Sequence, residues 1–432
     1  MIFANGKILP ASEQNRVLNE LEDRINETRA QKPLKTETVV NAIDALSRRI
    51  ERGDFNDLIA SLEIDNIDFY VGQAIKLLKR ESIEYKLQTE LGREFMTPYT
   101  TAPPFGLKKL RVCPVPLGTL FHIAAGNVDI LPAFSVAEGL LTGNINILKL
   151  PQADSGLTVQ IAARLVETEP ALADYLYVFD TPSTDIVAMK KMADMADGIV
   201  VWGGEAAVRA VRQLASPAAK IIEWGHRLSF AYLSGNHFQE SELKGLAEHI
   251  IQTRQLLCSS CQTIFLNTER MEDLHSFCRE FLPYLNRAEE KYPIREIGAV
   301  AEITLRKYNY VLENVLEGKP AENARQTFFG TNCSLTACED SELELSDMYG
   351  SCLVKRLPEQ KMMQTLRRKK GYLQTAGLIA EDTERSRLAE LLIRCGVVRV
   401  THAGSMSDTF SGEAHDGEYP LRRYLRIANI EV

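Results

Sequence analysis

Apolar side chains in the first hundred residues recur at helical spacing. One run places them in steps of four, three and four residues, at Val39, Ile43, Leu46 and Ile50. This spacing puts them on one face of an amphipathic helix. A second helix is expected over residues 69–90. Because no group of reactive side chains stands out here, residues 1–104 are predicted to form a helical layer for packing or oligomerisation.

From residue 115 the pattern changes to short apolar runs separated by amphipathic stretches of helix length. The runs cover residues 117–125, 145–150, 175–180, 198–202 and 220–224. Repeated strand–helix–strand segments predict right-handed crossovers and an α/β fold with a parallel, doubly wound sheet. Ligands of such sheets bind beyond the carboxyl ends of the strands. We therefore predict that residues 105–227 bind a nucleotide.

A second α/β unit is predicted over residues 228–404. A helix expected at 239–256 leads into an apolar segment with two cysteines, and later strands are expected at 352–357, 373–380 and 397–401. The final segment, residues 405–432, is too short for a domain and is predicted to form an arm.

Composition and charge narrow the class of protein. The 432 residues include 50 Lys and Arg against 58 Asp and Glu, a formal net charge of −8. This balance argues against a nucleic-acid-binding surface, which needs clustered basic side chains. The chain starts without the basic head and apolar core of a secretory signal, and charged residues interrupt its most apolar stretch, residues 115–150, so no membrane span is expected. Eight cysteines are too few for a disulfide scaffold, and we expect a cytoplasmic protein.

Two features could bind a nucleotide, although neither a GxxxxGK[ST] nor a GxGxxG motif is present. Gly203 and Gly204 lie where the strand at 198–202 passes into a helix, and glycines there let a phosphate approach the helix N-terminus. The alternative is a tight turn that binds nothing. Lys149 ends the strand at 145–150, where it could reach a ribose or phosphate. Its alternative role is a solvated strand terminus.

The cysteine pair Cys258 and Cys261 allows four interpretations. A zinc site would need two more ligands, and the spacing of Cys333 and Cys338 makes a poor second half. A thioredoxin-like redox pair would follow a first strand in a small domain, whereas this pair follows a helix. The other interpretations are a nucleophilic thiolate at a helix-to-strand junction and inert structural cysteines.

Taken together, five segments resemble the aldehyde dehydrogenase superfamily, and most closely its LuxC-type acyl-CoA reductase branch. They occur in the order of the family at residues 115–129, 139–151, 199–212, 255–265 and 415–426. The resemblance implies a Rossmann-like NAD(P)-binding domain, an α/β catalytic domain and an oligomerising extension. It also implies a mode of cofactor binding that lacks the GxGxxG fingerprint.

The resemblance assigns roles to several residues of this chain. Cys258 matches the family's nucleophile, and Lys149 matches the lysine that binds the cofactor ribose. Gly203 and Gly204 match the turn that faces the cofactor phosphates. Asn127 matches the asparagine whose amide, with the Cys258 backbone N–H, would stabilise an oxyanion. No metal is implied.

Two further matches are less direct. Glu223 falls on the general base of the aldehyde-oxidising members, a group that a thioester reductase does not need because activated water would release free acid. It has either a structural role or a part in oxidation. Asp347 falls loosely on the acidic residue that binds the cofactor ribose. None of the seven histidines is assigned to catalysis, and His415 is the one to test for docking of the C-terminal arm.

The resemblance implies reduction of an acyl-CoA thioester to an aldehyde by NADPH or NADH, through a thioacyl-enzyme on Cys258. Two alternatives on the same fold are oxidation of an aldehyde, with Glu223 as base, and reduction of an acyl phosphate. A third is a scaffold protein without activity. The expected partners are a second copy of the chain, in a homo-oligomer, and an acyl-transferring protein.

Overall fold

The computed structural model describes residues 1–31, 33–60, 67–106, 108–124, 131–151, 156–235, 237–295, 297–316 and 325–432. Within these ranges the chain forms two compact units. The first contains the described residues of 1–62, 68–225 and 409–432, and the second those of 63–67 and 226–408.

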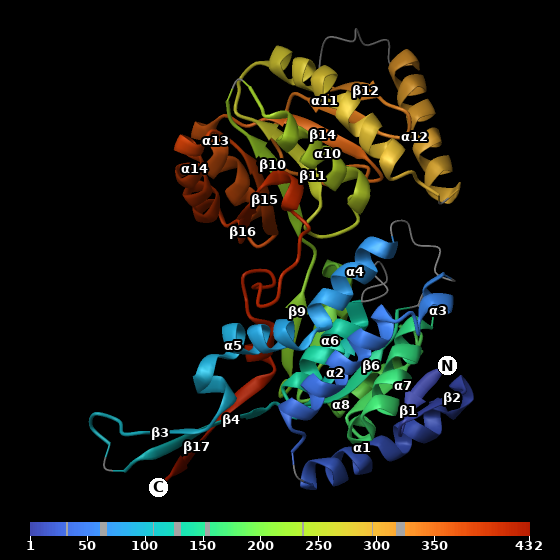
Figure 1. Cartoon of the computed structure of the whole chain (residues 1–432), viewed down its shortest axis with the longest axis vertical. Coiled ribbons are helices and arrows are strands. Elements are labelled where there is room, and N and C mark those ends of the chain that lie inside the picture. The colour runs from blue at the N-terminus through green and yellow to red at the C-terminus, as the bar shows by residue number, and fades with distance from the viewer. Residues whose placement is uncertain are drawn as a thin grey trace. The chain divides into compact units, whose positions relative to one another are not determined.

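A seven-stranded sheet with the order β2-β1-β7-β6-β5-β8-β9 forms the centre of the first unit (Figure 1). Its strands are β1 (Ile2–Ala4), β2 (Lys7–Leu9), β5 (Thr119–Ile123), β6 (Ile145–Lys149), β7 (Leu176–Phe179), β8 (Gly198–Trp202) and β9 (Lys220–Trp224). The last five pair in parallel, and they coincide with the five apolar runs. The predicted parallel, doubly wound α/β fold is therefore confirmed.

Helices cover both faces of this sheet. One core contains side chains of α2 (Thr36–Glu51), α6 (Leu131–Leu141) and α7 (Leu157–Thr168). The core on the other face contains side chains of α1 (Gln14–Ala30), α8 (Ile186–Asp194) and α9 (Glu205–Leu214). Helices α1 and α2 lie in the segment that was predicted to form a separate layer. In the structure they pack on opposite faces of the sheet that was predicted to bind a nucleotide. The domain boundaries at 104, 227 and 404 remain predictions.

The N-terminal hundred residues differ from the prediction in two places. Strands β1 and β2 form a hairpin, which the predicted helical layer did not include, and β1 extends the sheet beside β7. Asn5 and Gly6 form its turn with φ of 54° and 72°, as a two-residue hairpin loop requires. The single helix expected over 69–90 is two helices, α4 (Ile67–Leu78) and α5 (Arg80–Met96). The Asp44 carboxylate accepts a hydrogen bond from the Arg80 backbone N–H at 2.9 Å, which fixes the start of α5.

The second unit has its own seven-stranded sheet, in the order β12-β13-β14-β11-β10-β15-β16. Its strands are β10 (Leu228–Leu233), β11 (Cys261–Leu266), β12 (Arg325–Phe329), β13 (Ser334–Cys338), β14 (Ser351–Arg356), β15 (Leu373–Ile379) and β16 (Arg399–Thr401). All pairs are parallel except β12 with β13. The helices are α10 (Glu240–Thr253), α11 (Met271–Lys291), α12 (Ile297–Leu316), α13 (Glu359–Leu366) and α14 (Asp382–Cys395). Side chains of α10 and α11 pack on one face, and side chains of α13 and α14 on the other.

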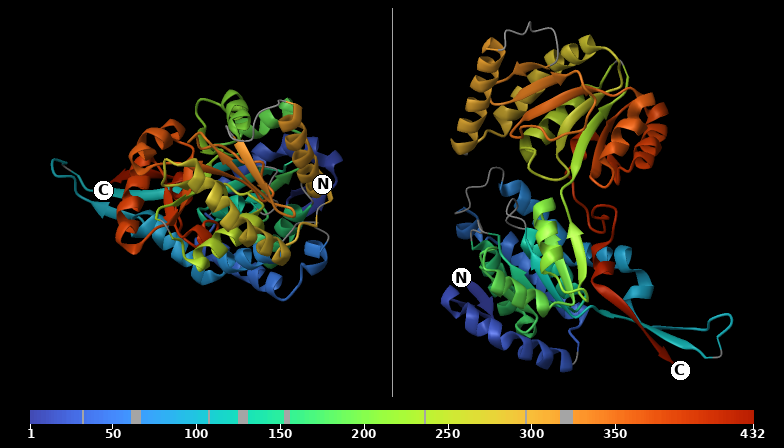
Figure 2. Two further views of the ribbon diagram at one scale, coloured as in Figure 1. Left: turned by 90° about the horizontal axis from the view of Figure 1, so that it is seen from above. Right: turned by 180° about the vertical axis from the view of Figure 1, so that it is seen from behind.

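A smaller antiparallel sheet belongs to the first unit and extends from it (Figure 2). It consists of β3 (Tyr99–Thr101), β4 (Leu110–Pro116) and β17 (Leu425–Glu431), with β4 in the middle. The predicted C-terminal arm therefore supplies an edge strand of a sheet, preceded by the short helix α15 (Pro420–Arg423).

Candidate active site

Cys258 lies in the short loop between α10 and β11, at the amino-terminal edge of the second sheet. Its side chain is exposed. The Gln374 side-chain amide donates a hydrogen bond to the sulfur, with 3.3 Å between Nε2 and Sγ. The Ser229 hydroxyl donates to the Cys258 carbonyl at 2.7 Å and accepts from the Thr375 backbone N–H at 3.0 Å. Residues of β10 and β15 thus form hydrogen bonds with the backbone and the side chain of Cys258.

A second set of hydrogen bonds fixes the loop where it leaves α10. Gln255 has a φ of 60°, and its side chain donates to the Cys261 carbonyl at 2.8 Å and to Ser346 Oγ at 3.0 Å. Its Oε1 accepts from the Gly350 backbone N–H at 3.1 Å. Gln262 donates to the Gln255 carbonyl and accepts from Ser346 Oγ, both at 2.8 Å. Because these groups are buried, their mutual hydrogen bonds specify one loop conformation.

The same network places Asp347, one of the predicted cofactor residues, on a segment attached to the Cys258 loop. Asp347 is exposed and directly follows Ser346. The Tyr349 backbone N–H donates to the Arg254 carbonyl at 2.9 Å. The structure therefore brings the segments of Cys258 and Asp347 together within the second unit.

A buried ion pair supports the end of α10. Arg254, with a φ of 51°, ends the helix, and its guanidinium lies 2.7 Å from the Glu289 carboxylate of α11. The two side chains are only 4% and 5% exposed. The Arg254 guanidinium also donates to the Tyr292 carbonyl, and Glu289 accepts from the Ile294 backbone N–H at 3.2 Å. A buried charge pair is tolerated only when hydrogen bonds of this kind surround it.

Cys261, by contrast, is fully buried on β11. Its backbone N–H donates to His249 Nε2 at 3.2 Å, and burial lowers the pKa of that imidazole to about 3. The histidine is therefore a neutral acceptor. None of the eight cysteines is in a disulfide, and burial raises the pKa of the Cys278 and Cys333 thiols to about 12. The geometry favours Cys258 as the reactive thiol, because thiolates need exposure and a donor.

Lys149 lies in the first unit, at the carboxyl end of β6. Its side chain is 4% exposed, and its ammonium donates to Ser183 Oγ at 2.9 Å. Burial lowers the pKa of the amine, against the raising effect of Asp180. A partly desolvated cation at this edge of a parallel sheet suits a ribose hydroxyl or a phosphate.

The Gly203–Gly204 turn connects β8 to α9 as predicted. Gly204 is the N-cap of α9, and no side chain in the part of the chain that the structure describes caps this helix end. A Cβ on Gly204 would meet no atom of the described residues within 4 Å. The turn thus leaves room for a phosphate at a helix N-terminus, so these residues and Lys149 fit a nicotinamide nucleotide.

Glu223, on β9, is held by Arg212 of α9. The guanidinium donates to both carboxylate oxygens, from Nε to Oε1 at 2.6 Å and from Nη2 to Oε2 at 2.9 Å. This ion pair connects β9, the last of the parallel strands, with α9, the helix that precedes it. Asn127, the predicted oxyanion donor, lies outside the described residues.

A series of hydrogen bonds between side chains next to β5 was not predicted. The Trp202 indole N–H donates to Ser135 Oγ at 3.0 Å, and that hydroxyl lies 2.7 Å from His122 Nδ1. His122 Nε2 lies 3.0 Å from Asn146 Oδ1, and burial lowers the imidazole pKa to about 4. A neutral His122 that accepts at Nδ1 and donates at Nε2 is consistent with every hydrogen bond in this series.

Within the described residues, no group of three or more His, Cys, Asp and Glu side chains could hold a metal ion. A helix long and apolar enough to cross a bilayer is likewise absent from the parts of the chain that the structure describes.

Comparison with known families identifies the family of this chain. The model of the family described as Acyl-CoA reductase (LuxC) matches residues 31–427 of this chain. The chain belongs to the LuxC family. The match includes the segments of Lys149, the Gly203–Gly204 turn and Cys258, and it confirms the resemblance stated above.

Curated LuxC relatives share modest sequence identity with the chain. The long-chain acyl-protein thioester reductase 2 of Photobacterium leiognathi is 22% identical over 329 residues, 73% of this chain and 65% of that protein. The long-chain acyl-protein thioester reductase of Photorhabdus laumondii is 29% identical over 161 residues, 37% of this chain and 34% of that protein. The chain thus matches less than two thirds of the length of these relatives.

Solved structures show the fold of the LuxC-family chain. Aldehyde dehydrogenase 21 from Physcomitrella patens aligns with a TM-score of 0.72 at 12% identity, over 98% of this chain and 91% of that one. A Sinorhizobium meliloti protein assigned as methylmalonate-semialdehyde dehydrogenase, complexed with NAD, aligns with a TM-score of 0.73 at 13% identity, over 100% and 97%. The fold is that of aldehyde dehydrogenases, as predicted.

Sequence reasoning missed the residues that hold the reactive groups: Ser183, Arg212, Ser229, Gln255 and Gln374. One signal was available, because Gln374 and Thr375 are polar residues at the start of an otherwise apolar strand. The partners of the other residues depend on contacts between distant segments.

Proposed function

We propose that this chain reduces a long-chain acyl thioester to the aldehyde, with Cys258 as nucleophile and NADPH or NADH as reductant. The observation that carries the proposal is the exposed Cys258 thiol with the Gln374 amide 3.3 Å from its sulfur. Cys261, three residues away, is fully buried and has no comparable access.

The proposed chemistry has two halves. In the first, the Cys258 thiolate attacks the thioester carbonyl, and the thiol of the donor leaves with a proton, so that a thioacyl-cysteine remains. The Asn127 amide and the Cys258 backbone N–H are proposed to stabilise the oxyanion, and losing one such donor costs about 2.7–4 kcal/mol in comparable sites. In the second, the aldehyde forms as the Cys258 thiolate departs. Sulfur serves both halves because it is a good nucleophile and a good leaving group.

Four residues are proposed to hold the nicotinamide nucleotide. Lys149 would bind a ribose hydroxyl, the Gly203–Gly204 turn would face the phosphates, and Asp347 would bind the second ribose. When bound, the reduced nicotinamide supplies the hydride. Support comes from the fold shared with an NAD-complexed aldehyde dehydrogenase and from the open N-terminus of α9.

The acyl donor is proposed to be a protein-bound thioester, which revises the expectation of acyl-CoA. The curated relatives are named long-chain acyl-protein thioester reductases, whereas the family description names acyl-CoA. Attack by Cys258 is the same for either donor. The acyl-transferring protein expected from the sequence is therefore the proposed donor, and a second copy of the chain remains the other expected partner.

We also propose that Glu223 has a positioning role. Both of its carboxylate oxygens accept hydrogen bonds from Arg212, which holds the side chain between β9 and α9. Oxidation of an aldehyde would need this carboxylate to activate water. The pairing supports reduction over oxidation.

Intact-mass analysis without cofactor tests the function. Wild type, Cys258→Ala and Cys261→Ala are incubated with tetradecanoyl-CoA or a tetradecanoyl carrier protein. An acyl adduct that is lost only in Cys258→Ala is expected, and NADPH or NADH should discharge it as tetradecanal. The two donors distinguish protein-bound from CoA-bound substrate. Absence of an adduct with both donors would overturn the proposal.

A further inference from the structure

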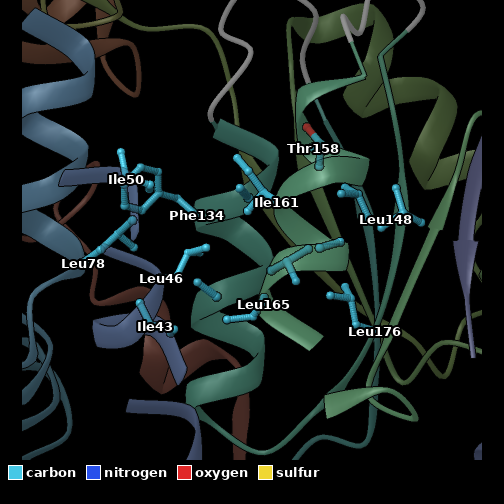
Figure 3. A pocket seen from close by; sticks show the side chains of 15 residues that line it. Ile43, Leu46, Ile50, Leu78, Phe134, Leu148, Thr158, Ile161, Leu165 and Leu176 are labelled. Atoms are coloured by element: carbon cyan, nitrogen blue, oxygen red, sulfur yellow. The ribbon is translucent and has the colours of Figure 1, made fainter. Parts of the chain in front are cut away.

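The apolar pocket of the first unit is a small packing void. It lies between α2, α4, α6 and α7, and its cavity volume is about 60 Å³ (Figure 3). An apolar cavity that binds one benzene molecule measures about 150 Å³, so this space cannot hold a substrate. The surface of the second unit close to Cys258 is a better place for recognition of the acyl donor.

Basic residues gather at the amino-terminal edge of the second sheet, the edge at which Cys258 lies. Residues 367–370, Arg-Arg-Lys-Lys, are the longest run of consecutive basic residues in the chain. They follow α13 and lead into the start of β15. Lys369 is half-buried and the other three side chains are exposed. The run therefore presents several positive charges to solvent.

Two arginines from other segments extend this run. Arg227, which directly precedes β10, donates a hydrogen bond from its guanidinium to the Gly371 carbonyl at 2.7 Å. Arg394 lies in the last turn of α14. Burial raises the pKa of the Cys395 thiol, and the guanidiniums of Arg394 and Arg367 both act against this shift, so the two lie near each other. Six residues thus form what we call the amino-edge basic cluster: Arg227, Arg367, Arg368, Lys369, Lys370 and Arg394.

The cluster is only partly neutralised by the chain itself. Arg368 lies 3.8 Å from the Glu342 carboxylate, and both side chains are exposed. Among the residues that the structure describes, no ion pair is formed by four other members, which are Arg367, Lys369, Lys370 and Arg394. The whole chain carries a net charge of −8, so these cations run against its overall balance. A concentrated positive patch attracts a complementary negative surface.

The cluster is close to the reactive thiol along the chain. Lys370 lies four residues before Gln374, a distance of at most about 14 Å for an extended segment. The Gln374 amide in turn lies 3.3 Å from the Cys258 sulfur. Strand β15 is two strands away from β11, which follows the Cys258 loop, or about 10 Å across the sheet. A partner bound to the cluster is therefore within reach of Cys258.

Exposed apolar side chains beside the cluster indicate the kind of partner. Ile393, which directly precedes Arg394, is 58% exposed, and Val398 is 42% exposed. The Val398 backbone N–H donates to the Gln374 carbonyl at 3.1 Å, which places this residue next to the cysteine's partner. Interfaces between proteins combine apolar side chains with a charged rim, whereas contacts to nucleic acid are more polar. The surface therefore suits an acidic protein.

We propose that the amino-edge basic cluster docks an acidic acyl-carrying protein, which presents its thioester to Cys258. The inference rests on the proposed function, because that function supplies a protein-bound thioester as donor. It adds the surface that recognises this donor and the charge that the donor must carry. Attraction between the two surfaces speeds their encounter and weakens as salt is added.

Reversing one charge of the cluster tests this inference. Lys370→Glu is compared with Lys370→Arg, which keeps the charge, and with Lys244→Glu, the same change at an exposed position near the start of α10. The rate of Cys258 acylation is measured by intact mass at low donor concentration. The donors are tetradecanoyl thioesters of an acidic acyl carrier protein, of CoA and of N-acetylcysteamine, which is uncharged.

The expected result is a selective loss of transfer from the carrier protein. In dilute buffer, Lys370→Glu should lower the ratio of its rate to that of the N-acetylcysteamine thioester about fivefold. This corresponds to twice the Coulomb energy in water of two charges about 8 Å apart. Lys370→Arg and Lys244→Glu should keep the wild-type ratio. At 1 M salt, where the Debye length is about 3 Å, the difference between the variants should disappear.

Several outcomes would overturn the inference. Equal ratios in Lys370→Glu and Lys244→Glu would show that the cluster does not recognise the donor, and so would wild type that reacts with the two small donors but not with the carrier protein. An equal loss with CoA would assign the cluster to phosphate groups. A change in molar mass of Lys370→Glu, measured by light scattering, would assign it to contact with a second copy of the chain.

Failure of the proposed function is distinguishable from failure of this inference. In that case wild type forms no adduct with any of the three donors. The Kd of fluorescently labelled acyl carrier protein still measures docking, and it should rise about fivefold in Lys370→Glu. An unchanged Kd would overturn the inference, as would a labelled DNA duplex that binds more tightly than the carrier protein.

Discussion

The Gln374 side-chain amide donates a hydrogen bond to the sulfur of Cys258, with Nε2 3.3 Å from Sγ. These residues are 116 positions apart in the sequence. A donor at this position stabilises a thiolate more than a thiol, because the negative charge strengthens the hydrogen bond. Gln374 therefore serves as a positioning residue that favours the reactive form of Cys258.

Replacing this donor should make the cysteine less reactive near neutral pH. Gln374→Ala is expected to raise the apparent pKa of the Cys258 thiol, since it removes a hydrogen bond that favours the charged form. The pH dependence of alkylation by iodoacetamide, followed by intact mass, measures the shift. Gln364→Ala, an exposed change on α13, is the matched control. Identical titration of the two variants would contradict the role of Gln374.

Breaking the buried ion pair should destabilise the second unit. Glu289→Gln leaves the Arg254 guanidinium buried without its counter-charge, and such changes cost about 3–5 kcal/mol. Chemical unfolding monitored by circular dichroism measures the loss. Glu269→Gln removes the exposed partner of Lys361 and should change the free energy of unfolding by no more than about 0.5 kcal/mol. Equal losses of stability in the two variants would show that the buried ion pair contributes no more than the exposed one.

Acid should destabilise the first unit through His122. Burial lowers its pKa in the folded state to about 4, below the value of about 6.5 expected for the unfolded chain. The unfolded chain therefore takes up the proton first, and stability is lost as the pH falls from about 6.5 to about 4. The loss amounts to about 3.5 kcal/mol once the pH is below both values, at about 1.4 kcal/mol per pKa unit.

His122→Asn tests this origin of the acid sensitivity. The variant is less stable at neutral pH, but its free energy of unfolding should depend less steeply on pH between about 6.5 and about 4. His237→Asn, at an exposed position of the second unit, should keep the wild-type slope. A wild-type slope in His122→Asn would assign the sensitivity to other groups, of which the buried His249 is the first to examine.

Lys149 is expected to contribute to cofactor affinity and not to thiol acylation. Lys149→Ala removes a charged donor that is 4% exposed, and a hydrogen bond to a charged group contributes about 1.5–3 kcal/mol. The Kd for NADPH or NADH, from fluorescence titration, should therefore rise about 10-fold to 100-fold. Acylation of Cys258 without cofactor should be unchanged. Lys190→Ala, on the surface of α8, is the control, and an unchanged Kd in Lys149→Ala would remove Lys149 from the cofactor site.

The sequence was sufficient to predict the parallel sheet of the first unit because strands buried on both faces are continuous apolar runs. It was less informative where short-range turn chemistry decides the structure. Asn5 and Gly6 between the segments Ile2–Ala4 and Lys7–Leu9 are a hairpin signal, and reading it would have predicted β1 and β2. The break between α4 and α5 had no comparable signal, since it depends on Asp44, which lies 36 residues from Arg80.

The site could be predicted only in part, for a physical reason. Lys149 and the Gly203–Gly204 turn follow strands, and topology alone brings such positions to one edge of a parallel sheet. The contacts that hold Cys258 and Glu223 join side chains from separate elements, which spacing along the chain does not encode. The roles assigned to the site residues remain predictions for the experiments above; these residues are Cys258, Asn127, Glu223, Lys149, Gly203, Gly204 and Asp347.

His415 offers a test of how the C-terminal arm is held. Its ring centroid lies 5.1 Å from that of Trp202 and 4.9 Å from that of Trp224, and these are the two tryptophans of the chain. His415→Ala is expected to change the intrinsic fluorescence and to lower the free energy of unfolding by about 0.5–1.5 kcal/mol, the contribution of an aromatic contact. Acylation of Cys258 should proceed at the wild-type rate if the ring only docks the arm. His275→Ala, which removes a ring near Phe328 in the second unit, should leave the fluorescence unchanged. Slower acylation in His415→Ala, without a change in stability or fluorescence, would instead assign this histidine to catalysis.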